Sequence, residues 1–205
     1  MTIRNTQNLI IEFTGSPNSG KTTLIHNLAE ALERDGLKVK VVQEDAEIVP
    51  KTIPKKTRIR NVWITFGQLQ SLLEILYDSE YDVILLDRGY YDALFWAHFL
   101  YTQNICSTEE CDSLVRILSE MNNTFSLLPD YLFILDVSIE ESLKRRCRQS
   151  ALPPTLTNED FLSSYKKELT YFSKIDSKHE YLDTTNLSVF EVTMLVHKKI
   201  INLLS

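Results

Sequence analysis

The sequence is poor in the features that define several classes of protein, and these shortages narrow its function. Only three of the 205 residues are cysteines, an odd number that does not build a disulfide framework. In a chain of this size such cysteines indicate reduced thiols in a cytoplasmic protein. No apolar signal region opens the sequence, and no stretch approaches the length of a membrane span. We therefore expect a cytoplasmic protein that has no membrane partner.

Positive charge is also in short supply. The formal net charge is −6 at pH 7, from 22 basic and 28 acidic side chains. An acidic chain is a poor general binder of nucleic acid, so any attraction for anions has to be local. A nucleic-acid partner is therefore less favoured than a small molecule. The hydrophobic content of 43% suffices for one buried core, and we expect a single domain over residues 1–205.

Apolar runs alternate with longer segments of helical periodicity. The runs are rich in Ile, Val and Leu and do not alternate strictly, which is typical of strands covered on both faces. They are Leu9–Phe13, Val39–Val42, Val83–Leu86, Tyr131–Leu135 and a short one near Tyr181–Leu182. Helices are expected over residues 22–35, 66–77, 91–101, 108–121, 139–148, 158–172 and 189–204. This order predicts an α/β fold, in which helices cover both faces of a parallel sheet.

One segment carries the complete phosphate-binding (Walker A) pattern Gly-x-x-x-x-Gly-Lys-Thr. It lies between the first predicted strand and the first predicted helix, the context that this motif requires. Glycines let the main chain approach phosphate oxygens, and the N–H groups there supply partial positive charge. Lys21 adds a full charge at the outer phosphates, and Thr22 offers its hydroxyl to Mg²⁺. The residues predicted to bind ATP here are Gly15, Ser16, Pro17, Asn18, Ser19, Gly20, Lys21, Thr22 and Thr23.

Charged side chains follow two other predicted strands. Asp87 ends the third strand, and in P-loop proteins such a carboxylate orients Mg²⁺, so Thr22 and Asp87 are the predicted metal residues. Arg88 comes next and is expected to point into the crevice where the carboxyl ends of parallel strands meet. Glu44 and Asp45 follow the second strand. One of these two would accept the proton of an attacking hydroxyl or hold metal, and the residues do not decide between them.

Two short segments are crowded with basic side chains. In the first, Lys144, Arg145, Arg146 and Arg148 fall within five positions. Positions 16–19 of the phosphate loop contain no arginine, so the charge of the moving phosphoryl group needs a partner from elsewhere. An arginine of this cluster, Arg145 or Arg148 first, is the candidate. A solvated helix end, favoured by the helix dipole, is compatible with the same residues.

The second basic segment follows the acidic end of the second strand and contains Lys51, Lys55, Lys56, Arg58 and Arg60. Capture of an acceptor phosphate, contact with a nucleic-acid end and a mobile surface loop are all consistent with it.

Aromatic and amide side chains come next along the chain, at Trp63, Phe66, Gln68 and Gln70. Aromatic walls beside an amide suit a nucleobase, because an amide both donates and accepts hydrogen bonds. For Phe66 we favour ordinary core packing, whereas for Gln68 both interpretations stand.

Together these features resemble the nucleoside and nucleotide kinase group of P-loop proteins, especially its thymidylate kinase and deoxynucleoside kinase branch. Gly15–Thr22, Glu44–Asp45, Asp87–Arg88 and the stretch Leu135–Arg146 carry the resemblance, in an order that spans nearly the whole chain. It implies a three-layer P-loop fold, a five-stranded parallel sheet, ATP, Mg²⁺ and a short arginine-bearing lid at about residues 144–157. It also implies that Asp183–Asn186 lies near the adenine, which adds Thr185 to the cofactor-binding residues.

Two departures from the group bear on the acceptor. Gln43–Ala46 stands where thymidylate kinases have an arginine and a Glu-Pro pair, and Trp63 lies well downstream of the position of the base-stacking Trp in deoxynucleoside kinases. The sequence therefore predicts an ATP-dependent kinase for a nucleoside or nucleoside monophosphate. Kinases for another hydroxyl (a riboside, a sugar or a nucleic-acid 5′ end) and a nucleotide-dependent switch are the alternatives. A homodimer is kept among the candidate assemblies.

Overall fold

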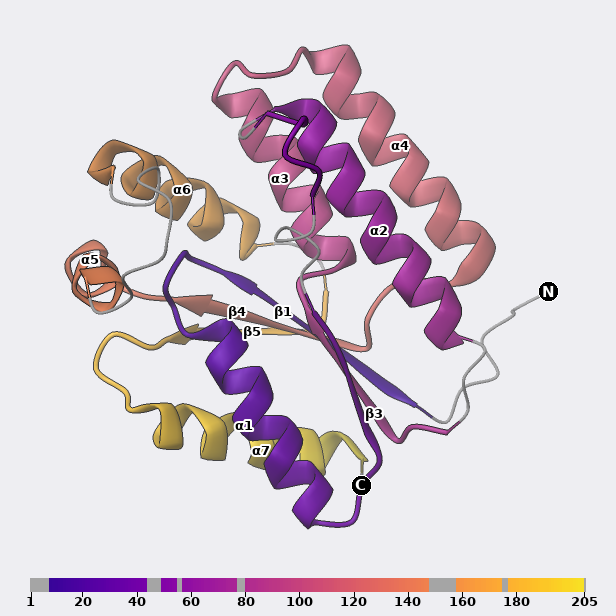
Figure 1. The fold of residues 1–205 in the computed structure, drawn as a ribbon, viewed down its shortest axis with the longest axis vertical. Coiled ribbons are helices and arrows are strands. Elements are labelled where there is room, and N and C mark those ends of the chain that lie inside the picture. The colour runs from indigo at the N-terminus through magenta and orange to yellow at the C-terminus, as the bar shows by residue number, and fades with distance from the viewer. Residues whose placement is uncertain are drawn as a thin grey trace.

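Strands and helices alternate along the chain (Figure 1). The computed structural model describes residues 8–43, 49–54, 57–76, 80–147, 158–174 and 177–204. The strands are β1 (Leu9–Gly15), β2 (Val39–Val42), β3 (Val83–Asp87), β4 (Tyr131–Asp136) and β5 (His179–Asp183). The helices are α1 (Lys21–Arg34), α2 (Arg58–Leu76), α3 (Tyr90–Thr102), α4 (Thr108–Phe125), α5 (Ile139–Cys147), α6 (Glu159–Phe172) and α7 (Val189–Leu204).

The sheet is parallel throughout, with the strand order β2-β3-β1-β4-β5. Its central strand, β1, has Phe13 opposite Asp87 of β3 and Gly15 opposite Leu135 of β4. The chain therefore leaves β1 between the carboxyl ends of β3 and β4. In an open parallel sheet this is the edge at which ligands bind.

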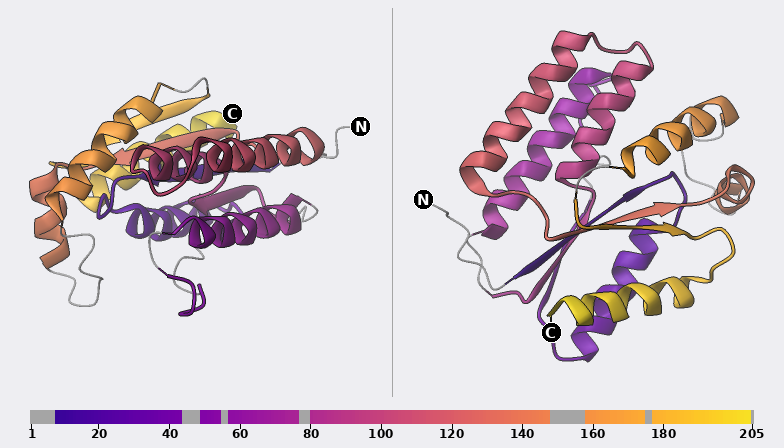
Figure 2. Two further views of the ribbon diagram at one scale, coloured as in Figure 1. Left: turned by 90° about the horizontal axis from the view of Figure 1, so that it is seen from above. Right: turned by 180° about the vertical axis from the view of Figure 1, so that it is seen from behind.

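Two layers of helices enclose the sheet, as the turned views in Figure 2 show. Alternate residues of each strand face opposite layers, because side chains alternate across a strand. Ile11 and Phe13 pack with α1 and α7, whereas Ile10 packs with α2, α3 and α4. The β4 side chains Leu132 and Ile134 pack against α3 and α6. No helix in the described part of the chain has the length and apolar character needed to cross a bilayer.

The predicted fold class is confirmed: a three-layer α/β fold with five parallel strands. One helix was misjudged. The helix expected from residue 66 begins at Arg58, because Thr57 caps it by accepting the Arg60 amide at 3.3 Å. Arg58 and Arg60 thus lie on a helix and not in a loop. Core packing of Phe66 is also wrong, since the residue is 46% exposed. The single-domain boundary stays a prediction.

Gly15 and Gly36 offer a matched test of how closely β1 and β4 approach. Both have positive φ, 132° and 88°. A Cβ on Gly15 would lie 1.8 Å from the Leu135 carbonyl oxygen, whereas no described atom would lie within 4 Å of one on Gly36. We expect Gly15→Ala to lower the free energy of unfolding by about 3 kcal/mol or more through forced overpacking. Gly36→Ala should cost only backbone strain, about 1 kcal/mol. Urea denaturation measures both, and equal losses would contradict this account.

Candidate active site

The loop from residue 15 to residue 22 wraps around the ammonium group of Lys21. Its Nζ donates to the carbonyl oxygens of Gly15 and Ser16 at 2.9 and 2.8 Å, and the residue is only 7% exposed. Gly20 supplies the left-handed turn (φ 94°) from which α1 begins at Lys21. Such a loop directs the lysine and the helix N-terminus at one point, the arrangement that binds phosphate groups. Thr23 lies exposed in the first turn of α1.

A hydroxyl–carboxylate pair stands beside this loop. Thr22 Oγ1 donates to Asp87 Oδ2 at 2.6 Å, joining α1 to the end of β3. Asp87 is 4% exposed, and its other oxygen, Oδ1, has no hydrogen-bond partner among the described residues. A buried carboxylate oxygen normally has a partner, so an orphan at this place fits a hard cation or one of its waters. The two predicted metal residues are therefore neighbours.

Arg88 follows in a conformation that non-glycine residues rarely adopt. Its φ is 72°, and its amide donates to the Phe13 carbonyl at 3.0 Å, which holds the turn against β1. The guanidinium pairs with Asp92 at 3.2 Å and lies 5.9 Å from the centre of the Trp96 ring. Rare backbone conformations of this kind gather at functional sites, where the surroundings hold them in place.

Glu12 is a buried acid that sequence reasoning missed. It lies in the middle of β1, is 0% exposed, and accepts the amides of Tyr91 and Asp92 at 3.1 and 2.7 Å. Burial raises its pKa to about 8, against the lowering effect of these amide hydrogen bonds. The available signal was a charged residue inside the apolar run Leu9–Phe13, which a buried strand does not carry without a reason.

Asp136, at the end of β4, is a second buried acid that anchors the loop. It accepts hydrogen bonds from Ser16 Oγ and Tyr181 OH, both at 2.5 Å, and pairs with Lys166 at 2.7 Å. Burial raises its pKa, but these donors outweigh that effect and hold the pKa below its usual range. The second residue of the phosphate loop is thus tied to β4, β5 and α6 at once.

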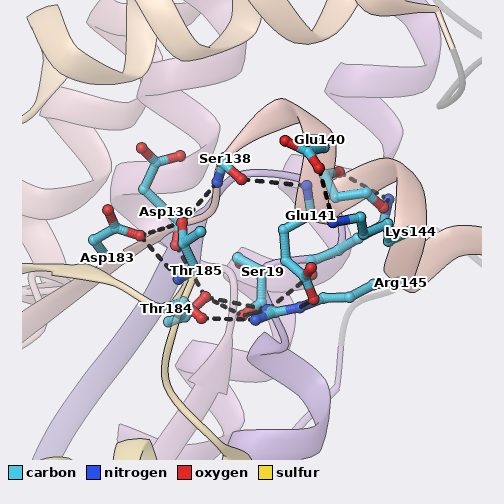
Figure 3. Close-up of polar contacts among 12 residues, drawn as sticks. Ser19, Asp136, Ser138, Glu140, Glu141, Lys144, Arg145, Asp183, Thr184 and Thr185 are labelled. Carbon is cyan, nitrogen blue, oxygen red and sulfur yellow. Dashed lines mark hydrogen bonds and ion pairs between the residues drawn. The ribbon is translucent and has the colours of Figure 1, made fainter.

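Arg145 lies between Ser19 of the phosphate loop and Thr184 (Figure 3). Its guanidinium donates to the carbonyl oxygen of Ser19 at 3.3 Å and to that of Thr184 at 2.6 Å, and it pairs with Glu141 at 3.1 Å. An arginine that uses its donors on carbonyl groups of its own fold clamps the loop to the β5–α7 turn. Thr185 lies in that turn, where its hydroxyl accepts the Ser138 amide at 2.9 Å.

The neighbouring Arg146 is more enclosed than Arg145, at 7% exposure. Arg145 and Arg148 were placed first from the sequence, because a run of basic residues does not show which side chain is buried. Arg148, Glu44 and Asp45, as well as Lys55 and Lys56, lie outside the described residues, and their predicted roles stay predictions.

The buried face of α2 begins polar and ends apolar. This face carries Asn61, Thr65 and Gln68, which are 9%, 2% and 5% exposed, up to the middle of the helix, and Leu72 and Ile75 beyond it. Asn61 Nδ2 and Gln68 Nε2 have no hydrogen-bond partner among the described residues. Two buried amide donors without partners indicate a place where a polar ligand is received.

The opposite face of α2 borders a hollow of about 440 Å³. It has the aromatic walls that the sequence suggested, but its amide is Gln70, which donates to Glu74 at 3.1 Å. Gln68 lies on the buried face and not in this hollow. The hollow is lined by Ile59, Val62, Trp63, Phe66, Gly67 and Gln70.

The parallel sheet, the wrapped lysine and the adjoining carboxylate define a P-loop nucleotide-binding protein of the kinase class. The family described as AAA domain (AAA_28) matches residues 10–152, more than half of the chain, and the chain belongs to that family. The predicted resemblance to nucleoside and nucleotide kinases and the assignment as a phosphotransferase are also confirmed.

Curated relatives and solved structures agree with this class. A probable thymidylate kinase from Archaeoglobus fulgidus is 29% identical over 168 residues, 78% of this chain and 79% of that protein. One from Methanococcus aeolicus is 28% identical over 202 residues, 95% and 97% of the two chains. The structure of deoxyadenosine kinase from M. mycoides, with products dCMP and dCDP bound, has a TM-score of 0.75 at 17% identity and covers 95% of this chain and all of that chain.

The raised pKa of Glu12 makes stability depend on pH. Between its ordinary value of 4.5 and about 8, the folded protein holds a proton that the unfolded chain has released. Rising pH therefore favours unfolding, and we expect the free energy of unfolding to fall between about pH 5 and about pH 8.5. Glu12→Gln, which does not ionise, should lose less stability over this range. Urea titrations at both pH values measure the difference, with the exposed Glu33→Gln as control. Equal losses in the wild type and Glu12→Gln would show that Glu12 is already ionised in the folded protein.

Proposed function

We propose that the protein is an ATP-dependent kinase that transfers the γ-phosphoryl group to a nucleoside or nucleoside monophosphate. The observation that carries the proposal is the contact between Thr22 and Asp87 next to the enclosed Lys21, with Asp87 Oδ1 buried and without a partner among the described residues. Thr22 and Asp87 would hold Mg²⁺, which offsets the negative charge of the phosphate oxygens when bound.

The loop supports ATP as the phosphoryl donor. Lys21 Nζ now donates to neutral carbonyl oxygens, and phosphate oxygens are stronger acceptors at the same place because they carry charge. Residues 15–23 would cradle the phosphates. Thr185, in the turn clamped by Arg145, would lie toward the nucleotide base.

Arginines of two elements support phosphoryl transfer. Arg88 would face the transferred group from the end of β3, and an arginine of the 145–148 cluster would offset its charge from the other side. Arg145 is engaged with loop carbonyls, which leaves Arg148 as the other first-ranked candidate. Glu44 or Asp45 would take the proton from a hydroxyl acceptor. An acceptor that is already a phosphate needs no base, because its oxygen is ionised at neutral pH.

The buried polar part of α2 supports a nucleobase as part of the acceptor. The amide nitrogens of Asn61 and Gln68 need carbonyl or ring-nitrogen acceptors, which bases offer at their edges. The relatives named thymidylate kinase and the neighbouring deoxyadenosine kinase structures agree with such an acceptor. The second basic segment gives weaker support to a phosphate or nucleic-acid end, because Arg58 already pairs with Glu110 at 3.1 Å.

Labelled ATP and a panel of acceptors test the proposal. With Mg²⁺ we expect labelled product from at least one nucleoside or nucleoside monophosphate, and none from sugars or a 5′-hydroxyl oligonucleotide. Lys21→Met should abolish ATP binding, and Asp87→Asn should lower kcat by about 100-fold while ATP still binds. Transfer only to a sugar or an oligonucleotide would show that the acceptor is not a nucleoside or nucleoside monophosphate. ATP hydrolysis unaffected by any acceptor would overturn the kinase in favour of a switch.

Gln68 gives a sharper test of the acceptor pocket. We expect Gln68→Leu to raise KM for the acceptor by about 5- to 100-fold, as the loss of one buried hydrogen bond predicts, and to leave the Kd for ATP unchanged. Stability should not fall, because the variant removes a buried donor without a described partner. Gln70→Leu, on the opposite face of the same helix, is the matched control. Equal acceptor KM values for both variants would contradict a role of Gln68 in binding.

A further inference from the structure

Two polar residues interrupt the face of β1 that packs against α3. Ile10 belongs to the apolar core on this face, and Glu12 and Thr14 follow on the same side of the strand. Both polar residues are 0% exposed. Their contacts lie on α3, close to 80 positions away in the sequence. A buried carboxyl group at this depth is costly unless the fold supplies donors for it.

Glu12 takes the place of a missing helix cap. The residue before α3 is Gly89, which offers no side chain to the first-turn amides. Glu12 accepts two of these amides, those of Tyr91 and Asp92, from the interior of the sheet. The approach is close, since a Cβ on Gly89 would lie 2.9 Å from Glu12 Oε2 and would displace the carboxyl group. The start of α3 is therefore set by the sheet and not by its own sequence.

Asp92 connects the first turn of α3 to Arg88. Its Oδ1 accepts Thr14 Oγ1 at 2.6 Å, and its Oδ2 pairs with Arg88 at 3.2 Å. Asp92 is held by its amide on Glu12 and by its carboxylate on Thr14. The direction of the Arg88 guanidinium thus depends on where β1 holds the first turn of α3.

We propose that Glu12 is a positioning residue that, through the first turn of α3 and Asp92, aims Arg88 at the group being transferred. The inference rests on the proposed function, in which Arg88 faces the phosphoryl group. An error of about 1 Å in the position of a reacting group can lower a rate by about 100-fold. A carboxyl that merely stabilised the fold would affect the melting temperature and leave the turnover of the folded enzyme unchanged.

Glu12→Leu and Glu12→Gln separate these roles. Leucine offers no acceptor, so we expect kcat to fall by about 10- to 100-fold with the Kd for ATP unchanged, because the phosphate loop keeps its own contacts. Glutamine retains one acceptor oxygen for the Asp92 amide and should keep kcat within about threefold of the wild type. Glu33→Leu, on the exposed side of α1, is the matched control. Unchanged kcat in Glu12→Leu would overturn the proposal.

Asp92→Asn tests the same chain of contacts if Glu12→Leu does not fold. The asparagine oxygen still accepts from Thr14, but its amide nitrogen replaces the partner of Arg88. We expect a fall in kcat of about 10-fold with the Kd for ATP unchanged, and a lower melting temperature because Arg88 loses a buried carboxylate partner. Wild-type turnover in this variant would overturn the positioning role of the pair.

Amide hydrogen exchange tests the role of Glu12 separately from the proposed kinase function. The amides of Tyr91 and Asp92 should be protected in the wild type, exposed in Glu12→Leu, and protected at Asp92 in Glu12→Gln. This readout needs no substrate. If amide protection depends on Glu12 but the protein has no kinase activity, the proposed function is wrong and the contact between Glu12 and α3 stands. If the protein is an active kinase but amide protection does not depend on Glu12, only the positioning role of Glu12 is wrong.

Discussion

The close approach of β1 to β4 at Gly15 is the constraint on which the rest of the site depends. The Ser16 amide donates to the Leu135 carbonyl at 2.8 Å, at a place where a Cβ on Gly15 would lie 1.8 Å from the same oxygen. The chain therefore leaves the sheet while it is still bonded to the neighbouring strand. This fixes the first corner of the loop and turns the Gly15 and Ser16 carbonyls onto the Lys21 ammonium. An anion site formed from main-chain groups needs such a rigid edge, because amide dipoles are useful only when they do not have to reorganise.

The acidic side chains around the predicted phosphate site are bonded to donors of the fold, Asp87 through one of its two oxygens. Glu12 is bound by α3 amides, Asp136 by two hydroxyls and an ammonium, and Asp87 by Thr22. Because Glu12 keeps its proton up to a pKa of about 8 and Asp136 pairs with the Lys166 ammonium, neither places an uncompensated negative charge beside Lys21 and the loop amides. A net charge of −6 is thus compatible with the proposed binding of a polyanion, because the local field and not the total charge acts on a ligand.

Local sequence patterns predicted the helices and strands, but they could not predict contacts between distant parts of the chain. The apolar runs gave all five strands, and the loop motif carried its own context of strand and helix. The start of α2 was missed because a threonine cap after two prolines resembles a loop in sequence. Glu12 and Asp136 were missed for another reason: their partners Asp92 and Ser16 are 80 and 120 positions away. The contacts of Arg145 could not be predicted for the same reason, because a run of four basic residues does not show which carbonyl groups each side chain will contact.

The elements on either side of residues 148–157 are both joined to the phosphate loop. Before them, Arg145 of α5 holds the Ser19 carbonyl. After them, Tyr165 of α6 donates to the Gly15 carbonyl at 3.2 Å, and the neighbouring Lys166 pairs with Asp136. The loop is thus bonded at both ends, to α5, whose last residues fall within the predicted lid (about residues 144–157), and to α6, which follows that segment. Tyr165 and Lys21 both donate to the Gly15 carbonyl, so α6 contacts the same main-chain group that holds the lysine, whereas α5 contacts the loop at the Ser19 carbonyl near its other end.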